Sequence, residues 1–531
     1  MPPPNRKLAD SLQQLERIQE RGARVLRGSD LTRTHRERLI AAGFVEEVIK
    51  GWYLAARPGA PGAAGSPSHA TAAWFAGMRD FVAGYCDARF GEGWHLGPEQ
   101  SLLLRSGERT LPRQLQIWTP RGNNQLIALP QDCSLFIYRA PAALPNTAEA
   151  DERGLRLVAL ADALVAVSAS FFAQQPLAAG ICLGMVDDTA PLLARLLDGS
   201  RSVVAGRLAG AFRAMGRGDF ADSIVATMRS AGCTVQESSP FEAPQPSLTA
   251  GRPESPYVQR LRRTWAAMRD NVIAAFPEPG PPPTQLEKTL RDIDDRYIAD
   301  AYHSLSIEGY RVTAALVEKV RSGIWDPEGA DQQQRDAMAA KGYFDAHERV
   351  KDTIAQLMQV RMQQPRSRKR GARKPQRVRD ALGAWYLALF SPSVQAGLLQ
   401  ASDLAGWRND QVFIRGALHV PPSKEAVRDC MPVLFELIEN EPHPAVRAVL
   451  GHFLLVYIHP YMDGNGRLAR FLMNAMLVSG GYVWTVIPIE RRTAYMLALE
   501  RASSYADIEP FAKLVARLTR EQTRKPLARP K

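Results

Sequence analysis

The sequence predicts a multidomain protein in which a winged helix-turn-helix and an α+β domain precede a mainly α-helical domain. The chain has 531 residues, several times the usual size of one domain. Two stretches rich in Pro and Gly, residues 57–68 and 236–283, read as linkers. From residue 284 to 519 the apolar residues recur at mostly helical spacing, and residues 520–531 read as a tail.

Bulk composition narrows the class of protein. A net charge of +12 favours contact with polyanions such as nucleic acid or nucleotides, or reflects only a free use of arginine. Five cysteines without a CxxC pair argue against a zinc ribbon and favour a reduced compartment. The N-terminus lacks the apolar stretch of a signal peptide, and the most apolar region, residues 155–172, reads as a buried helix too short for a bilayer. We therefore expect a cytoplasmic protein without membrane contact.

The first 56 residues carry the pattern of a winged helix-turn-helix. Residues 6–22 have helical spacing, Gly28-Ser29-Asp30-Leu31 is a helix-start signal, residues 34–43 form a short helix, and residues 44–54 read as two strands. Such a domain lays one helix in the major groove and places cations on phosphates. The alternative is a protein-docking domain with a solvated basic face. The candidate DNA contacts are Arg33, Arg36, Arg38 and Lys50.

Residues 69–235 read as a separate α+β domain. Residues 114–118 and 133–138 alternate at strand period, and helical patterns follow to residue 231. A basic winged helix followed by such a domain resembles the AbiEi family of antitoxin-like transcription regulators. This resemblance rests on residues 31–54 and on the layout after them.

The strongest signal is the run His459-Pro460-Tyr461-Met462-Asp463-Gly464-Asn465-Gly466-Arg467-Leu468-Ala469-Arg470. Pro460 should end the apolar helix before it, and the glycines permit a tight loop, residues 459–466, called here the glycine loop. Because this loop opens a helix, its free N–H groups form a phosphate cradle. Arg467 and Arg470 lie on one face of the first turn, where they suit a di- or triphosphate. Asp463 can hold Mg²⁺ against the phosphates, and His459 can take a proton from a hydroxyl.

These residues resemble the motif of the Fic family at every position but one, because Tyr461 stands where the family has Phe. The resemblance spans residues 284–519 and implies a protein adenylyltransferase that moves AMP from ATP to a Tyr, Ser or Thr hydroxyl. It implies His459 as the general base, Asp463 as the Mg²⁺ ligand, and Arg467 and Arg470 on the distal phosphates. Gly464, Asn465 and Gly466 would form the anion hole. Related Doc-type kinases carry Lys where Gly466 stands, which makes kinase activity the less favoured variant.

Two further segments fit the resemblance. Residues 411–420, called here the flap segment, alternate between apolar and polar side chains and have a turn signal near Arg415 and Gly416, which predicts a hairpin. Such a hairpin resembles the family's flap, which aligns a target segment by strand addition. A plain structural hairpin is the alternative. The residues expected to dock a target are Ile414, Arg415, Gly416 and Ala417.

The second segment, Ser304-Leu305-Ser306-Ile307-Glu308-Gly309, ends a helix predicted over residues 293–309. It resembles the family's inhibitory motif, which implies that Glu308 pairs with Arg470 and blocks the γ-phosphate site in cis. Ser304 belongs to the same motif. The alternative is a Glu on a solvated helix end.

The resemblance leaves three functions open. The chain could be an autoinhibited adenylyltransferase with a DNA-binding front end, and its site could also run in reverse to remove AMP. It could be a transcriptional regulator whose Fic core is only a nucleotide sensor, or a toxin fused to its own antitoxin-like domain. The expected partners are ATP, a protein target or the chain itself, DNA through the N-terminal domain, and a second copy of the chain in a homodimer.

Overall fold

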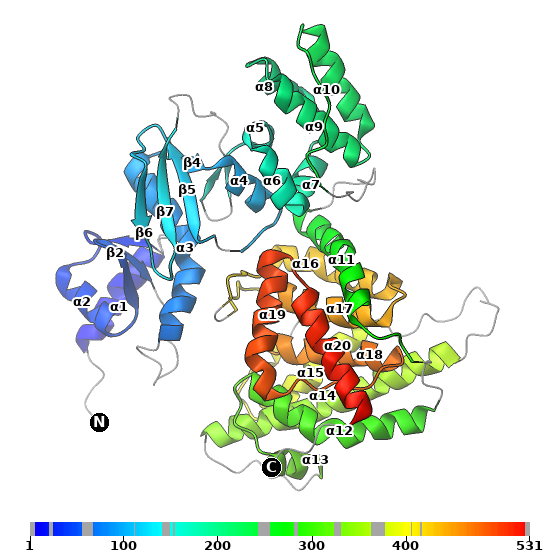
Figure 1. Ribbon diagram of the computed structural model, residues 1–531. Helices are drawn as coiled ribbons and strands as arrows, with labels where there is room; N and C mark the ends of the chain where they lie inside the picture. Colours follow the sequence, from blue (N-terminus) through cyan, green and yellow to red (C-terminus); the bar gives the residue numbers. More distant parts are fainter. Residues whose placement is uncertain are drawn as a thin grey trace. The chain divides into compact units, whose positions relative to one another are not determined.

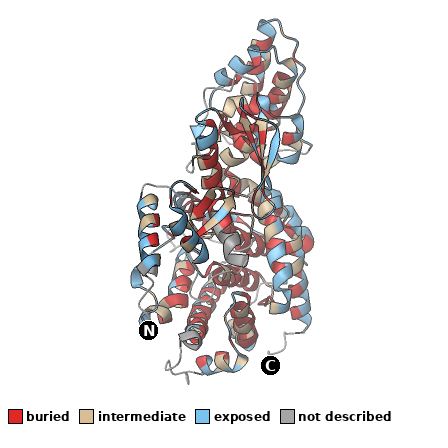
Figure 2. Ribbon diagram, turned by 90° about the vertical axis from the view of Figure 1, so that its left-hand side faces the viewer, coloured by how far each residue is buried: buried red, intermediate tan, exposed pale blue. Residues whose placement is uncertain are grey.

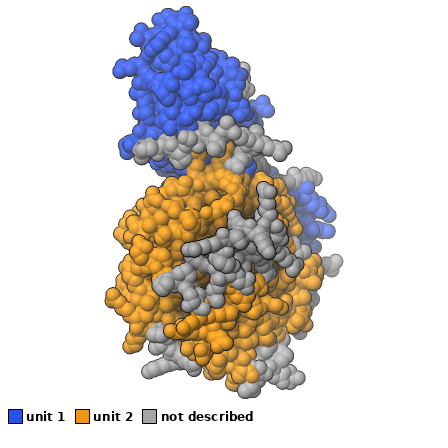
Figure 3. All heavy atoms as spheres, turned by 90° about the vertical axis from the view of Figure 1, so that its right-hand side faces the viewer, with its two compact units in different colours: residues 1–256, 413–420 blue, residues 257–412, 421–531 orange. Residues whose placement is uncertain are grey.

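The structure is a computed structural model. It describes residues 6–20, 25–55, 67–110, 112–140, 149–151, 154–242, 255–280, 285–322, 331–362, 378–404, 406–414 and 417–525. The polypeptide forms two compact units, one of residues 1–256 with 413–420 and one of residues 257–412 with 421–531 (Figure 3). Within the described ranges, no helix combines the length and the apolar character needed to cross a bilayer.

The first unit begins with a small helical and stranded region (Figure 1). Its elements are α1 (Arg6–Gln19), β1 (Val25–Arg27), α2 (Arg33–Ala41), β2 (Val45–Ile49) and β3 (Trp52–Ala55), and the three strands form an antiparallel sheet in the order β1-β3-β2. The helix predicted to start at residues 28–31 is wrong. A turn replaces it, because the Asp30 carboxylate accepts a hydrogen bond from the Arg27 N–H at 2.7 Å. Helix α2 begins after Thr32, whose hydroxyl caps the His35 N–H.

A four-stranded sheet and a group of helices make up the rest of the first unit. Strands β5 and β7 pair in parallel within the order β4-β5-β7-β6, which confirms the two strands predicted here. The single helix predicted over residues 155–172 is wrong, because β9 and two short helices occupy it and Val167 is extended at the break. The elements are α3 (Pro67–Phe90), β4 (His95–Leu96), α4 (Pro98–Arg105), β5 (Gln114–Thr119), β6 (Gln125–Ala128), β7 (Ser134–Arg139), β8 (Glu149–Ala150), β9 (Arg156–Leu157), α5 (Leu160–Ala166), α6 (Ala169–Gln174), α7 (Pro176–Gly184), α8 (Ala190–Leu197), α9 (Ser202–Ala214) and α10 (Gly218–Ser230).

The second unit is built from helices, as predicted. Its buried residues run through the interior of the helix group (Figure 2) and form one large hydrophobic cluster. The elements are α11 (Pro256–Ala275), α12 (Leu286–Ile307), α13 (Ala314–Arg321), α14 (Asp331–Met362), α15 (Val378–Gln395), η1 (Ala401–Leu404), α16 (Lys424–Asn440), α17 (Pro444–Ile458), α18 (Asn465–Ser479), η2 (Ile489–Arg491), α19 (Arg492–Tyr505) and α20 (Glu509–Arg524).

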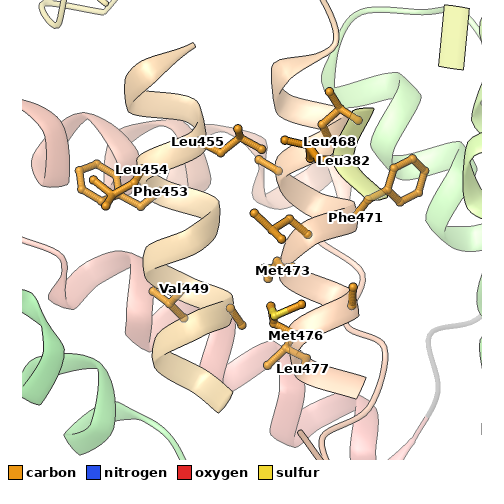
Figure 4. Close-up of a cluster of buried hydrophobic side chains, with 14 of the residues drawn as sticks. Leu382, Val449, Phe453, Leu454, Leu455, Leu468, Phe471, Met473, Met476 and Leu477 are labelled. Atoms are coloured by element: carbon orange, nitrogen blue, oxygen red, sulfur yellow. The ribbon is translucent and has the colours of Figure 1, made fainter. Parts of the chain in front are cut away.

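Helices α17 and α18 form the rigid base of the glycine loop. Leu455 of α17 and Leu468 and Met476 of α18 lie between the two helices (Figure 4), and all three are buried. Each buried side chain of this size contributes roughly 1.5–3 kcal/mol through the hydrophobic effect. The loop that joins the helices is therefore held at both ends by the core.

The boundaries of the second unit differ from the predicted ones. The linker predicted over residues 236–283 is wrong in its middle, because α11 packs into the hydrophobic cluster. Its buried apolar side chains recur at helical spacing, at Val258, Leu261, Trp265, Met268 and Val272. The predicted tail is also shorter, because α20 continues to Arg524 and the Gln522 amide donates to the Val486 carbonyl at 2.7 Å. The helix predicted over residues 293–309 starts earlier than predicted, at Leu286, and ends at Ile307. Most of the linker at 57–68 lies outside the described residues.

The flap segment does not form the predicted hairpin. Its described residues, 411–414 and 417–420, contain no ladder of paired strands, and Arg415 and Gly416 lie outside the described residues. The Ala417 N–H donates to the Ile414 carbonyl at 3.1 Å. His419 instead forms an isolated antiparallel bridge with Thr110, and Val420 is buried in the same cluster as the four-stranded sheet. The backbone that a hairpin would pair internally is therefore used elsewhere in the first unit.

Candidate active site

The glycine loop joins the C-terminus of α17 to the N-terminus of α18. Helix α17 ends at His459, which adopts a left-handed conformation with φ 52° and ψ 60°, and Pro460 prevents the helix from continuing. Gly464 precedes α18 with φ 83°, a conformation that a residue with a Cβ rarely adopts. The first amides of α18 have no acceptor within their own helix, so they point their N–H groups out of its end. The glycine loop therefore lies at the start of a helix, as predicted.

The side chain of Asn465 closes this loop. Its Oδ1 accepts from the Tyr461 N–H at 3.0 Å, and its Nδ2 donates to the Tyr461 carbonyl at 2.8 Å. Asn465 is buried, so the side chain holds the bend together and only its backbone N–H remains for an anion. Tyr461 itself is buried and stacks on Tyr386, with ring centroids 3.9 Å apart. Tyr461, which stands where the motif has Phe, therefore packs inward.

The imidazole of His459 is set up as a neutral base. Its Nδ1 lies 3.2 Å from the Val456 carbonyl, so the neutral ring carries its proton on Nδ1 and leaves Nε2 as an acceptor. Burial, with a smaller contribution from the Arg408 cation, lowers the pKa of His459 to about 4. The Val456 carbonyl, Glu308 and Asp463 act in the opposite direction. At neutral pH the ring is uncharged and can accept a proton from a hydroxyl.

Two buried guanidiniums lie beside the start of α18. Arg467 is 1% exposed, and its guanidinium carbon lies 5.1 Å from the ring centroids of both Tyr310 and Phe390. Arg470 is 3% exposed, and its Nε donates to the Ser304 hydroxyl at 2.8 Å. Among the described residues, Arg467 Nε and Arg470 Nη1 have no hydrogen-bond acceptor. Orphaned donors on buried cations fit the oxygens of a bound phosphate chain.

Glu308 occupies the end of α18. Arg470 Nη2 donates to Glu308 Oε1 at 2.6 Å and to the Ser304 carbonyl at 3.1 Å. A Cβ at Gly466 would lie 2.3 Å from Glu308 Oε1 and 3.2 Å from Arg470 Nη1. The carboxylate therefore lies directly over Gly466, at the positive end of the helix, where an anion is expected to bind.

Asp463 is the candidate metal ligand. Its Oδ1 accepts from the Gly464 N–H at 2.6 Å, and its Oδ2 accepts from Arg467 Nη2 at 3.0 Å. The side chain is 63% exposed. No group of three or more His, Cys, Asp or Glu side chains suited to a metal ion occurs in the described ranges. A single carboxylate beside a phosphate site fits Mg²⁺, which keeps several waters and takes its other ligands from substrate phosphates.

Several contacts of the site were not predicted. Tyr310 and Phe390, which enclose Arg467, lie far from it in the sequence and carry no motif. Arg492 and Tyr495, on helix α19, have structural partners. Arg492 Nε donates to the Ile307 carbonyl at 2.9 Å, and the buried Tyr495 hydroxyl lies 2.8 Å from His452 Nε2. Arg491 lines a groove of about 360 Å³ between α19 and α20.

The four candidate DNA contacts differ in their exposure to solvent and in their hydrogen bonds within the domain. Arg33 is 83% exposed and pairs with Glu37 at 2.7 Å. Arg36 Nη1 donates to the Gly28 carbonyl at 2.7 Å, and Arg38 Nη1 donates to the Lys7 carbonyl at 3.3 Å. Lys50 is exposed at the turn between β2 and β3. Arg36 and Arg38 therefore help to hold the domain together, whereas Arg33 and Lys50 face solvent.

Comparison with known proteins matches part of the second unit. Residues 380–477 match the model of the Fic/DOC family. A protein adenylyltransferase Fic of Nematostella vectensis is 42% identical over 117 residues, which cover 21% of this chain and 27% of that protein. The same-named protein of Drosophila willistoni is 38% identical over 117 residues, which cover 21% of this chain and 23% of its own. The chain thus spans about a quarter of the length of these curated relatives.

Solved structures give the same family name. Fic-1 from C. elegans is 18% identical, with a TM-score of 0.36 over 66% of this chain and 97% of that one. A Fic domain containing signaling protein from Bacteroides thetaiotaomicron is 19% identical, with a TM-score of 0.33 over 49% of this chain and 87% of that one. The loop between α17 and α18 lies within the residues 380–477 that match the Fic/DOC family model.

Proposed function

We propose that the chain is a protein adenylyltransferase that moves AMP from ATP to a Tyr, Ser or Thr hydroxyl of a protein, the chain itself included. One observation carries the proposal. A single short loop joins a neutral imidazole, His459, to a helix start that carries two buried guanidiniums with orphaned donors. The curated relatives that match this region are named as adenylyltransferases, which supports the same chemistry.

The residues of the loop have separate tasks in this proposal. The N–H groups at the start of α18, with Arg467 and Arg470, bind the phosphates of ATP and spread their charge. Asp463 would hold Mg²⁺, which supplies charge neutralisation on the phosphates. The target oxygen forms a bond to the α-phosphorus while the bond to the bridging oxygen breaks and pyrophosphate leaves. The hydroxyl proton goes to Nε2 of His459, and holding these groups in line supplies much of the rate.

We further propose that Glu308 inhibits the enzyme in the same chain. Its carboxylate accepts from Arg470 and lies where a γ-phosphate oxygen would meet Gly466. Because two anions cannot share one buried guanidinium N–H group without strong repulsion, ATP binds productively only when Glu308 turns away. Ser304 holds the Nε side of the same guanidinium, so it orients Arg470 in both states.

Incubation with α-labelled ATP tests both proposals. We expect weak label on the wild-type protein, strong label on Glu308→Gly, and none on Glu308→Gly/His459→Ala. The matched control is Glu308→Gly/His443→Ala, because His443 caps the opposite end of the same helix α17. Mass spectrometry of the modified peptide identifies the transferred group. Label that persists without His459, or an added mass other than AMP, would contradict the proposed reaction.

A second proposal concerns the first 55 residues. We propose that α1, α2 and the β2–β3 hairpin act as a winged helix-turn-helix that binds DNA, within an AbiEi-like region. The support is the exposure of Arg33 on α2 and of Lys50 at the hairpin turn. Anisotropy titrations of labelled duplex DNA test it. We expect Arg33→Ala/Lys50→Ala to weaken binding and to flatten its salt dependence, and Arg201→Ala, an exposed cation elsewhere in the unit, to leave both unchanged.

A further inference from the structure

We propose that Arg408 is a positioning residue that ties the catalytic His459 to both ends of the flap segment. It would hold the backbone of His459 in a fixed relation to both flanks of this segment. This inference rests on the proposed adenylyltransferase function, and it is argued from four hydrogen bonds of Arg408 to backbone carbonyls. Arg408 lies between η1 and the flap segment and is 3% exposed.

On one side, Arg408 holds the backbone of the glycine loop. Its Nε donates to the His459 carbonyl at 2.8 Å, and its own N–H donates to the Pro460 carbonyl at 2.8 Å. His459 has a left-handed backbone conformation, which residues other than glycine rarely adopt unless their surroundings impose it. Two hydrogen bonds from one residue to consecutive carbonyls supply such a constraint.

On the other side, Arg408 holds the two ends of the flap segment. Its Nη1 donates to the Asp410 carbonyl at 2.7 Å, and its Nη2 donates to the Pro422 carbonyl. These carbonyls lie on either side of residues 411–421, so the guanidinium closes the base of the segment. Gln411 adds a second link, because its Nε2 donates to the Pro421 carbonyl at 2.9 Å. That link joins the two ends of the segment to each other and does not reach His459.

The chemistry explains why an arginine suits this place. A guanidinium is planar and rigid and offers five donors in fixed directions, so it can bind three carbonyls from three segments at once. A lysine ammonium has three donors on a flexible stem and cannot hold the same geometry. A displacement of either end of the flap segment is therefore passed to the His459 carbonyl through one stiff group. Arg408 thereby links the position of His459 to the base of the flap segment, which is more than a contribution to stability.

The test uses the full chain carrying Glu308→Gly, with Arg408→Gln and Arg408→Lys added separately. The matched control is Arg428→Gln, because Arg428 is an exposed arginine near the same segment whose Nη2 donates to Asn409 Oδ1 at 2.5 Å. We expect kcat to fall about 10- to 100-fold, since misplacement by about 1 Å costs that much. KM for ATP should stay within about threefold, since the hydrogen bonds that carry this inference position the backbone around His459 and end on the carbonyls of residues 410, 422, 459 and 460. The control should change neither.

Hydrogen exchange supplies a readout that does not need activity. We expect the peptides covering 409–422 and 455–466 both to exchange faster in Arg408→Gln, and only the first to do so in Gln411→Ala. An unchanged kcat, or faster exchange in one peptide alone for Arg408→Gln, would overturn the inference. If Glu308→Gly protein shows no transfer at all, the proposed function fails, and the exchange data still decide the coupling. Where Arg408→Gln does not fold, Arg408→Lys, which keeps the buried charge, carries the same measurements.

Discussion

Replacing the carboxylate of Glu308 should destabilise the empty protein and activate it by a related amount. Arg470 is almost fully buried, and Glu308 Oε1 lies 2.6 Å from its Nη2, with the Glu308 side chain 28% exposed. A hydrogen bond to a charged group of this kind contributes about 1.5–3 kcal/mol. Glu308→Gln keeps the shape and removes the charge. We therefore expect its free energy of unfolding, without nucleotide, to fall by up to about 3 kcal/mol.

The same energy should appear as activation. If the pair must break before ATP binds productively, its loss raises the rate of transfer at low ATP by about 10- to 100-fold, since 1.4 kcal/mol is a factor of ten. Urea unfolding measures the first quantity, and incorporation of labelled AMP measures the second. Glu318→Gln is the control, because Glu318 forms an exposed pair with Arg321 that is expected to matter little. A Glu308→Gln protein that is as stable and as slow as wild type would refute the reasoning.

Three further predictions follow from the site. Gly466→Ala should weaken ATP binding about tenfold or more, even in the Glu308→Gly protein, because the added methyl group fills the phosphate site at the start of α18. Calorimetry measures the affinity for ATP, and an unchanged affinity would contradict this. Tyr461→Phe should keep the rate within about threefold and change stability by less than about 1.5 kcal/mol, because the ring stacking survives; kinetics and urea unfolding check this. Stability should fall as the pH drops from about 6.5 toward 4. Folding lowers the pKa of His459 to about 4 and that of His452 to about 3, so the unfolded chain binds those two protons first. A urea midpoint that is equal at pH 7 and pH 5 would exclude this effect.

The glycine loop could be predicted because its chemistry is contiguous. The proposed base and metal ligand, the glycines and the two guanidiniums all lie within residues 459–470, and the glycines and Pro460 have a local conformational reason. By contrast, the contacts that enclose Arg467 come from Tyr310 and Phe390, and the constraint on His459 comes from Arg408. Such partners are brought together only by the packing of helices distant in sequence. A sequence pattern without an alignment carries no signal for them.

The errors in the fold have equally specific causes. Proline-rich stretches flank α11 on both sides, and their composition predicted a linker. The buried residues of α11 nevertheless recur at helical spacing, which indicates a helix. The alternation in the flap segment predicted a hairpin, but alternation only shows that one face is buried. Val420 is buried, and the adjacent His419 takes its backbone partner from Thr110. The period of a strand does not identify the strand with which it pairs.

In the proposed inhibition, release of the contact between Glu308 and Arg470 needs a side-chain rotation and no movement of α12. Arg470 is held by two groups of this helix, Ser304 in the last turn and Glu308 at the C-cap. The Ser304 contacts are buried within a helix whose apolar face packs into the core, so moving them would cost much of that packing. Glu308 is partly exposed at the helix end, and Gly309 follows it with φ 93°. A rotation of this carboxylate toward solvent therefore frees Nη2 while Ser304 still orients the guanidinium, and a phosphate oxygen can replace the carboxylate without leaving a buried charge unpaired.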